Sequence, residues 1–314
     1  MNFPVFDLHC DTAYSLLGHY ADEDYQGLAK TKGHIDLERA RQLPGYAQCF
    51  ACFTTPEEPG NPVDHFERML ALMHQEMAVN HETIRFAYTP QEIEENRKNG
   101  IMSAILTIEG PAGFDFDPAL LGDLYNVGFR VSNLGWNEKN PLTGSHITGG
   151  GLTDQGREYV KEAQRLGMLV DVSHISDEGF WDIMDITQAP ILATHSNSRA
   201  VCHASRNLTD DMFKAICQTG GVAGINLYPH FLGENANLDT VCDHIFHFLE
   251  LDPQGTHIAL GGDLDGVESL PKGFSGVQDY SALAARLLER GLEGKAVFNI
   301  FWKNAMEVFQ RCCM

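Results

Sequence analysis

Histidines and carboxylates stand at the ends of several short apolar runs in this chain. Imidazole and carboxylate together suit Zn²⁺ best, with Mn²⁺, Fe²⁺ or Co²⁺ as alternatives. The residues are His9 and Asp11 in VFDLHCDT, Glu109 in AILTIEG, His174 in LVDVSH and His195 in ILATHS. Because each one ends the same kind of run, we expect all five to lie at the C-terminal rim of one barrel of parallel strands.

The spacing of these residues predicts two cations. Residues two apart in a strand point to the same face, so His9 and Asp11 can share one ion. His174 and His195 end consecutive strands and can share a second ion. The carboxylate of Glu109 can bridge two ions about 3.5–4 Å apart, as two-metal hydrolases require. We therefore predict a binuclear site.

A pair of cations predicts hydrolytic chemistry, because bound water loses a proton near neutral pH and the ions stabilise an oxyanion. Asp263 in GGDLDG is placed to accept that proton and pass it to a leaving amine, or else acts only as a hydrogen-bond acceptor. Asp265, in the same motif, is expected to be structural. Arg206 in HASRNLTDD could bind a substrate carboxylate, or instead form a salt bridge that orders its loop.

Eight apolar runs would supply the strands that position these groups. They span residues 5–9, 48–53, 101–108, 128–134, 168–173, 190–194, 221–228 and 257–262. Helical patterns lie between them, at 62–82, 153–167, 209–219, 239–250 and 281–290. Short apolar strands alternating with helices predict an α/β protein with a (β/α)8 TIM barrel, formed as a single domain by residues 1–314.

Two segments, 13–47 and 137–152, are longer than ordinary loops between a strand and a helix. Both follow the C-terminal end of a predicted strand, so we expect them to cover the active site. The remaining histidines are expected to be structural or superficial. His244 and His247 lie one turn apart on a predicted helix without an evident third ligand. The others in this class are His19, His34, His65, His74, His81, His146, His203 and His257.

Composition limits the partners and the compartment. The formal net charge of −21 over 314 residues disfavours nucleic acid and anionic membranes. We expect no membrane span and no secretory signal, because no apolar stretch is long enough and the N-terminus lacks a basic region. The eight cysteines form no spaced framework, so we expect reduced thiols in a cytoplasmic protein.

Seven stretches of the chain resemble the membrane dipeptidase (renal dipeptidase, M19 peptidase) family of the amidohydrolase superfamily. They are DLHCDT (7–12), HIDLERARQLPGYAQCFACF (34–53), TIEG (107–110), GLTDQGREYVKEAQRLGMLVDVSH (151–174), ATHSNSRAVCHASRN (193–207), NLYPHFL (226–232) and GGDLDGV (261–267). The resemblance implies a barrel of the metallo-dependent hydrolase type with two zinc ions and, with no independent support from the sequence, a homodimer.

The resemblance also implies roles for single residues. One zinc ion would be held by His9, Asp11 and Glu109, and the other by Glu109, His174 and His195. The family's catalytic aspartate corresponds to Asp263, and Glu109 would be the bridging group. Arg206 and Tyr228 would contact the substrate carboxylate.

One motif departs from the pattern of the animal enzymes. These carry a substrate-contacting histidine after the fourth strand, where this chain reads NLGWNEKN (133–140). Trp136 takes the place of the histidine, and Asn140 keeps the family's asparagine. We expect both to line the substrate site, and we expect oxyanion stabilisation to depend more on the ions. The secretion and lipid anchor of the animal members are not expected here.

These patterns predict a zinc-dependent dipeptidase that cleaves small dipeptides with a free C-terminal carboxylate, with a D-residue tolerated at that end. One alternative is a related binuclear amidohydrolase that acts on N-acyl amino acids, lactones or cyclic amides. A second alternative is a metal-stabilised barrel that binds a ligand without catalysis. The presence of a proton acceptor, Asp263, beside a complete ligand set favours an enzyme.

Overall fold

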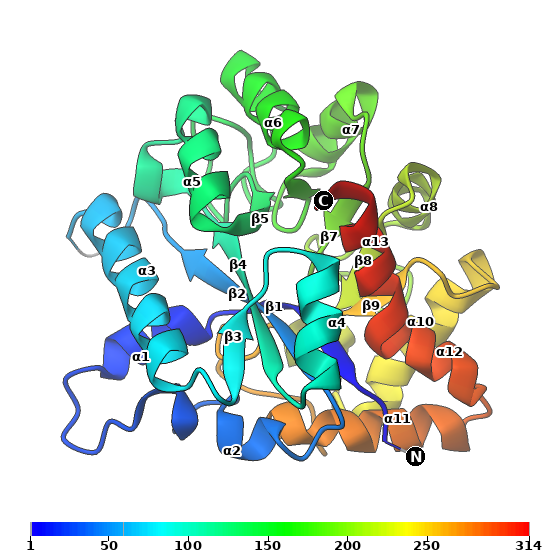
Figure 1. Cartoon of the computed structure of the whole chain (residues 1–314). Helices are drawn as coiled ribbons and strands as arrows, with labels where there is room; N and C mark the ends of the chain where they lie inside the picture. Colours follow the sequence, from blue (N-terminus) through cyan, green and yellow to red (C-terminus); the bar gives the residue numbers. More distant parts are fainter. Residues whose placement is uncertain (1, 59, 314) are drawn as a thin grey trace.

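The computed structural model describes residues 2–58 and 60–313, whose strands all pair in parallel within one curved sheet (Figure 1). The strands are β1 (Val5–Cys10), β2 (Tyr46–Phe53), β3 (Ile84–Phe86), β4 (Met102–Glu109), β5 (Phe129–Asn133), β6 (Leu169–Asp171), β7 (Ile191–Ala193), β8 (Val222–Ile225) and β9 (Ile258–Leu260). Their order is β2-β1-β9-β8-β7-β6-β5-β4-β3, and β2 also pairs with β4. This pairing closes the barrel and confirms the predicted fold class.

Strand β3 is the element of the sheet that the sequence did not predict. Its three residues, IRF, are too few and too mixed in polarity to form an apolar run. It pairs with the start of β4 at residues 102–104, on the edge that β5 occupies further along at residues 106–108. β3 is therefore an addition beside the barrel and not one of the strands that close it.

Several barrel strands end earlier than predicted. β6 ends at Asp171 and β8 at Ile225, although the apolar runs continue to residues 173 and 228. At these ends, side chains accept backbone N–H groups in place of the hydrogen bonds between strands. Asp171 Oδ1 accepts the backbone N–H groups of Ser173 and Thr194, each at 2.9 Å. The carboxylate of Asp171, for which the sequence predicted no role, thus holds the ends of two neighbouring strands in place.

Helices surround the barrel and follow the strands in alternation (Figure 1). They are α1 (Thr12–His19), α2 (Leu37–Ala40), α3 (Pro62–Val79), α4 (Pro90–Lys98), α5 (Leu121–Val127), α6 (Asp154–Leu166), α7 (Asp177–Ile186), α8 (Asp210–Thr219), α9 (Pro229–Leu232), α10 (Leu238–Leu251), α11 (Tyr280–Glu289), α12 (Gly294–Phe298) and α13 (Asn304–Cys312). Among the described residues, no helix combines the length and the apolar character that a bilayer crossing requires.

The five predicted helices are present, with small shifts at their ends. α6 begins after Thr153, whose hydroxyl accepts the backbone N–H of Gly156, and ends before Gly167 at φ 84°. α3 ends at Val79 instead of residue 82, because the side-chain amide of Asn80 donates to the carbonyl of Glu76 at 2.9 Å. The segment 13–47, expected to be a loop, contains α1 and α2.

An apolar cluster fills the N-terminal end of the barrel. It contains buried residues from the strands: Phe6, Leu8, Ala47, Cys49, Ile105, Val131, Leu169, Leu192, Val222 and Ala259. Trp302, Met306 and Phe309 of the C-terminal segment belong to the same cluster. The rings of Phe6 and Phe309 lie 5.2 Å apart. α13 therefore closes this end, and the polar groups that could do chemistry occupy the opposite end.

Candidate active site

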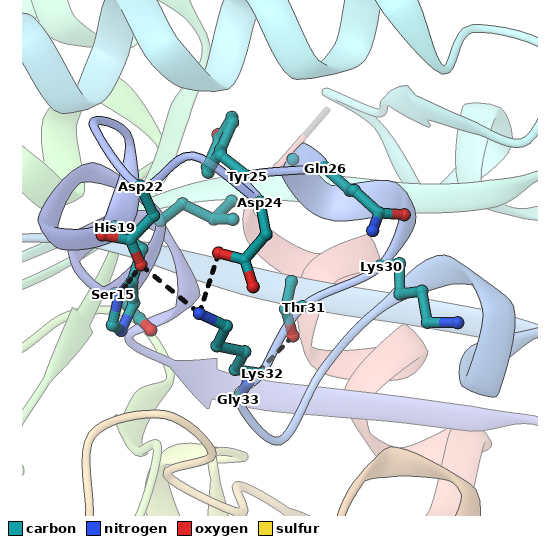
Figure 2. A pocket seen from close by; sticks show the side chains of 12 residues that line it. Ser15, His19, Asp22, Asp24, Tyr25, Gln26, Lys30, Thr31, Lys32 and Gly33 are labelled. Atoms are coloured by element: carbon teal, nitrogen blue, oxygen red, sulfur yellow. Dashed lines mark hydrogen bonds and ion pairs between the residues drawn. The ribbon is translucent and has the colours of Figure 1, made fainter.

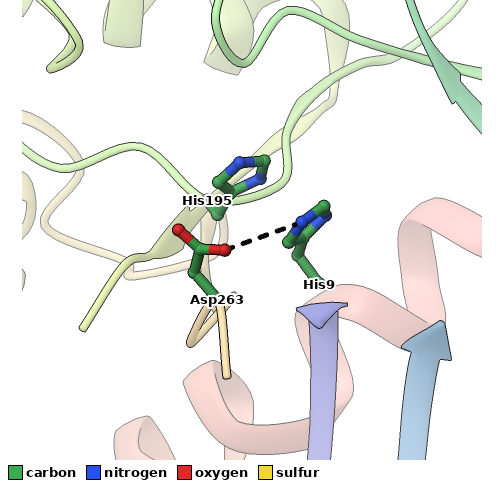
Figure 3. A group of neighbouring side chains, drawn as sticks. All are labelled: His9, His195 and Asp263. Carbon is green, nitrogen blue, oxygen red and sulfur yellow. Dashed lines mark ion pairs between the residues drawn. The ribbon is translucent and has the colours of Figure 1, made fainter. Parts of the chain in front are cut away.

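The structure brings all five predicted ligands together at the C-terminal end of the barrel. One group of donor atoms comes from His9, Asp11 and Glu109, and a second from Glu109, His174 and His195; within each group the atoms lie within 4.8 Å of one another. A third group joins His9 and His195 to Asp263 (Figure 3). The rings of His9 and His195 stack with their centroids 3.8 Å apart. Residues far apart in the sequence thus share one small volume.

Glu109, the last residue of β4, lies at the centre of the cluster. Its Oε2 is 3.1 Å from His9 Nε2, whereas its Oε1 is 3.1 Å from His174 Nε2 and 3.7 Å from His195 Nε2. The two oxygens of one carboxylate therefore face two different sets of ligands. This is the geometry that a bridge between two cations needs.

An extra residue in β1 turns His9 into the barrel. Asp7 pairs with Gln48 of β2, but Cys10 pairs with Phe50, so three steps along β1 match two along β2. Leu8 belongs to the apolar cluster inside the barrel, and His9, the next residue, also points inward to the ligands. A bulge commonly re-aims a side chain next to an active site. Regular alternation, on which the sequence prediction relied, would have pointed His9 away from Leu8.

Backbone strain is concentrated at the site. His174, Asp263 and Asp265 adopt φ values of 71°, 58° and 67°, which residues other than glycine rarely adopt. Asp263 Oδ1 lies 3.8 Å from His9 Nε2, and its Oδ2 accepts the side-chain amide of Asn226 at 3.0 Å. Asp265 instead accepts the hydroxyl of Thr12 at 2.7 Å, in agreement with a structural role.

Burial sets the charges of the cluster. It raises the pKa of Glu109 to about 8 and the pKa of Asp263 to about 6. Burial also lowers the pKa of His174 and His195 well below the imidazole range, so both rings are neutral and keep a lone pair. His9 Nε2 and Asp11 Oδ1 are buried without a hydrogen-bond partner. At His9, burial is outweighed by the Glu109 and Asp11 carboxylates, which raise the pKa of the ring, so a cation must displace a proton there. The two neutral imidazoles, the carboxylates and the orphaned atoms fit a pair of divalent cations.

A chain of hydrogen bonds that the sequence did not reveal holds the Nδ1 side of the His195 ring. Thr194 Oγ1 lies 2.7 Å from His195 Nδ1 and 2.5 Å from Asp171 Oδ2. Because a carboxylate only accepts, the hydroxyl donates to Asp171 and accepts the Nδ1 proton of the ring. That tautomer leaves Nε2 free as a ligand atom. The signal in the sequence is the acid inside the buried run MLVDVS, which has no reason to lie among apolar residues without such a partner.

Gly110, which follows Glu109, is required by the turn that presents the bridging carboxylate. Its φ is 72°, and a Cβ at this position would lie 1.9 Å from the carbonyl oxygen of Thr54. We expect Gly110→Ala to destabilise the protein by more than about 2 kcal/mol, because the clash adds to the backbone strain. Urea unfolding of metal-free protein measures this difference.

Gly100→Ala is the matched control for that substitution. Gly100 has φ 70°, and no atom lies within 4 Å of a Cβ built on it, so only the backbone strain remains, about 1 kcal/mol. Equal destabilisation by the two substitutions would show that the contact with Thr54 does not constrain the turn.

Arg206 is held near the cluster with unused donors. It is 4% exposed, and its Nη1 donates to Ser196 Oγ at 2.6 Å. Its Nε and Nη2 are buried and have no partner. Arg199, by contrast, forms the salt bridge that orders this loop, with Asp177 at 2.7 Å. Arg206 therefore has two buried N–H groups that are available to an anion. The salt bridge that orders the loop is formed by Arg199.

A cavity of about 200 Å³ lies in the segment between α1 and α2 (Figure 2). None of the predicted ligands lines it. Lys32 on its wall lies 2.9 Å from Asp24 and 3.7 Å from Asp22. Lys32 is thus paired with two acids of the same wall, and the predicted ligands lie elsewhere.

Known proteins of similar sequence and structure identify the family. The model of the membrane dipeptidase family (Peptidase family M19) matches residues 1–312. The chain belongs to the membrane dipeptidase family. It is 29% identical to an uncharacterized dipeptidase of Schizosaccharomyces pombe, over 98% of this chain and 81% of the relative. It is 32% identical to an uncharacterized Klebsiella pneumoniae protein encoded in the pqqA 5′ region, over 80% of this chain and 97% of the relative.

Solved structures of the same family share this fold. A metallo peptidase of Rhodobacter sphaeroides, liganded with a phosphinate mimic of L-Ala-D-Ala, superimposes with a TM-score of 0.91 at 25% identity, covering 99% of this chain and 100% of the other. The dipeptidase AC, an M19 metallo peptidase, gives a TM-score of 0.91 at 27% identity, covering 100% and 99%. The chain is thus a metallo-dipeptidase, a hydrolase that acts on peptide bonds.

The residues expected to contact the substrate of this dipeptidase occupy different surroundings. Trp136 packs edge-on against Phe53, with ring centroids 5.2 Å apart, and its ring lies 6.3 Å from that of His174. Tyr228 is half-buried before α9, and its ring lies 5.0 Å from that of Phe231. The guanidinium carbon of Arg206 lies 6.0 Å from the same ring of Phe231. Tyr228 and Arg206 therefore both lie against the ring of Phe231.

Asn140 is placed differently from the other expected substrate contacts. Its Nδ2 donates to the carbonyl of Leu134 at 2.8 Å. Its Oδ1 accepts the backbone N–H groups of Leu142 at 2.8 Å and Thr143 at 3.1 Å. The amide is thus engaged by its own loop, and this geometry favours an indirect role in shaping the segment that carries Trp136.

Proposed function

We propose that this chain is a zinc-dependent dipeptidase that cleaves small dipeptides with a free C-terminal carboxylate. Two zinc ions would be held by His9, Asp11 and Glu109 and by Glu109, His174 and His195, with Mn²⁺, Co²⁺ or Fe²⁺ as possible replacements. The observation that carries the proposal is the carboxylate of Glu109, whose two oxygens each lie 3.1 Å from a different histidine. A donor set of this kind suits a pair of divalent cations.

The residues of the chain would divide the reaction among them. Two such ions supply a hydroxide nucleophile near neutral pH and polarise the peptide carbonyl. Asp263 accepts a proton as the nucleophile attacks, and then donates it to the leaving amine. The unpaired nitrogens of Arg206 bind the C-terminal carboxylate of the dipeptide, beside Tyr228. Trp136 bounds the site next to His174.

A relative supports a proposal about the stereochemistry of the substrate. The Rhodobacter sphaeroides metallo peptidase, which shares the fold throughout, was solved with a phosphinate mimic of L-Ala-D-Ala. We therefore propose that a D-residue is accepted at the C-terminal side. We propose that the segments 13–47 and 137–152, and not the polar cluster at the open end of the barrel, select the side chains of the substrate.

The decisive experiment removes and restores the metal. Protein stripped with a chelator should be inactive, and reloading with zinc should restore hydrolysis of dipeptides such as L-Ala-D-Ala. N-acyl amino acids, lactones and cyclic amides are assayed in parallel to test for a different amidohydrolase. Failure of the reloaded protein to hydrolyse any member of a broad dipeptide panel would overturn the proposal.

Metal affinity should depend on pH. The pKa of Glu109, raised by burial to about 8, means that the metal-free carboxyl holds a proton at neutral pH and must lose it when a cation binds. We expect zinc affinity to rise by about tenfold per pH unit for each proton released, up to about pH 8. Calorimetry in buffers of different ionisation enthalpy measures both the affinity and the released protons. An affinity that is flat below pH 8 would contradict this coupling.

A further inference from the structure

The side chain of Asn137, in the loop between β5 and α6, lies between two imidazole rings. Its Oδ1 is 3.0 Å from His174 Nδ1 and 3.0 Å from His146 Nε2. The rings of the two histidines are 6.2 Å apart. The sequence alone predicted no role for Asn137 and a structural or superficial position for His146. The structure instead puts both directly behind a metal ligand.

This contact decides where His174 carries its proton. An amide oxygen has two lone pairs, so it can accept one N–H from each ring. His174 then bears its proton on Nδ1 and keeps a lone pair on Nε2, which lies 3.1 Å from Glu109 Oε1. The opposite orientation of the amide would place its N–H₂ group against Nδ1 and move the ring proton to Nε2. A ring in that state could not bind a cation through Nε2.

The same oxygen fixes the second ring in the opposite tautomer. His146 donates from Nε2, so its Nδ1 accepts the hydroxyl of Ser205 at 2.9 Å. The backbone N–H of His146 also donates to the carbonyl of His174 at 2.8 Å. Ser205 directly precedes Arg206, whose Nε and Nη2 are buried without a partner. A continuous set of hydrogen bonds thus joins a metal ligand to the loop that holds the anion-binding arginine.

We propose that Asn137 is a positioning residue that fixes the metal-binding tautomer of His174 and, through His146, ties this ligand to Ser205 in the loop that carries Arg206. The inference rests on the proposed metal site and adds residues outside its ligand set. Loss of such a partner behind a ligating histidine typically weakens metal binding by about 10–100-fold.

Two substitutions of similar size separate the hydrogen bond from packing. Asn137→Leu keeps the shape but removes the acceptor, and should weaken the binding of one of the two zinc ions by about 10–100-fold. Asn137→Asp keeps an acceptor oxygen and should retain both ions. Lys139→Ala, at an exposed position two residues away, is the control for general effects on the loop. Chelator competition measures the affinities and requires no turnover, so its result is independent of whether dipeptides are the substrates.

Wild-type affinity for both ions in Asn137→Leu would overturn the proposal. A measurement on the unaltered, zinc-loaded protein covers the case in which the variant fails to fold. Nitrogen-15 NMR of the histidine side chains should show His174 protonated at Nδ1 and His146 at Nε2. A proton on Nδ1 of His146 would break the link to Ser205 and also overturn the proposal.

The link to the substrate loop has its own test. His146→Phe keeps a ring of similar size and leaves Asn137 free to serve His174, so both zinc ions should remain. Without its bond to His146, the Ser205 hydroxyl loses one anchor, although Arg199 still holds its carbonyl. We expect the KM for a dipeptide to rise several-fold with little change in kcat. An unchanged KM would show that His146 does not connect the two parts of the site.

Discussion

Replacing Asp263 by asparagine should leave both metal ions bound and lower kcat by roughly 10²–10⁴-fold, the usual contribution of a general acid–base group. Asparagine preserves the size of the side chain and can still accept the amide of Asn226, which lies 3.0 Å from Asp263 Oδ2. It cannot take up and return a proton. In the metal-free protein, burial raises the pKa of Asp263 to about 6, so the surroundings of this carboxyl favour its protonated form more than water does.

Steady-state kinetics and metal analysis on the same samples check this expectation. Asp211→Asn removes an equivalent carboxylate whose side chain is 82% exposed, and should change neither quantity. Unchanged turnover in Asp263→Asn would remove Asp263 from the mechanism. Loss of a metal ion would instead show that Asp263 acts as a ligand, as its place in the group with His9 and His195 allows.

Replacing Arg206 by methionine should lower kcat/KM for dipeptides by roughly 10²–10³-fold. Removing one member of a buried, hydrogen-bonded charge pair costs about 2–5 kcal/mol, and about 1.4 kcal/mol corresponds to a factor of ten. Dipeptide amides have no C-terminal carboxylate, so their slower hydrolysis should change little. The preference for the free acid over the amide is therefore the quantity to measure.

Arg199→Met is the matched control in the same loop. Arg199 pairs with Asp177 and donates to the carbonyl of Ser205 at 2.9 Å, so its loss should lower the thermal stability. It should not abolish the preference for a free carboxylate. If the two variants have the same effect on that preference, Arg206 orders the loop and does not bind the substrate.

The ligands were predictable because their residue types stand at strand ends. Parallel strands in a barrel present these ends at one rim, so the chain order alone predicted that His9, Glu109, His174 and His195 would meet. The number of barrel strands and the five helices followed from the same alternation. The direction in which each side chain points was less predictable. His9 points inward because of a bulge in β1, and a bulge depends on pairing with β2 that no local pattern encodes.

The groups behind the ligands could not be predicted from spacing. Asp171 reaches His195 through Thr194, and Asn137 reaches both His174 and His146. These contacts join segments that are distant in the sequence and use common polar residues. The acid in the buried run MLVDVS is the one sign of them that the sequence carries. The amide of Asn140 shows the opposite case, because a motif suggested a substrate contact where the structure finds bonds within the loop.

α13 and the apolar cluster close one end of the barrel, so we expect substrate to reach the site from the polar end. A dipeptide enters, and both amino acids leave, past the same segments. With Arg206 in its proposed role, the amino acid that bears the original carboxylate would remain bound after cleavage, and we expect it to be the last to depart. Free amino acids of that kind will therefore compete with incoming substrate, and accumulated product will slow turnover.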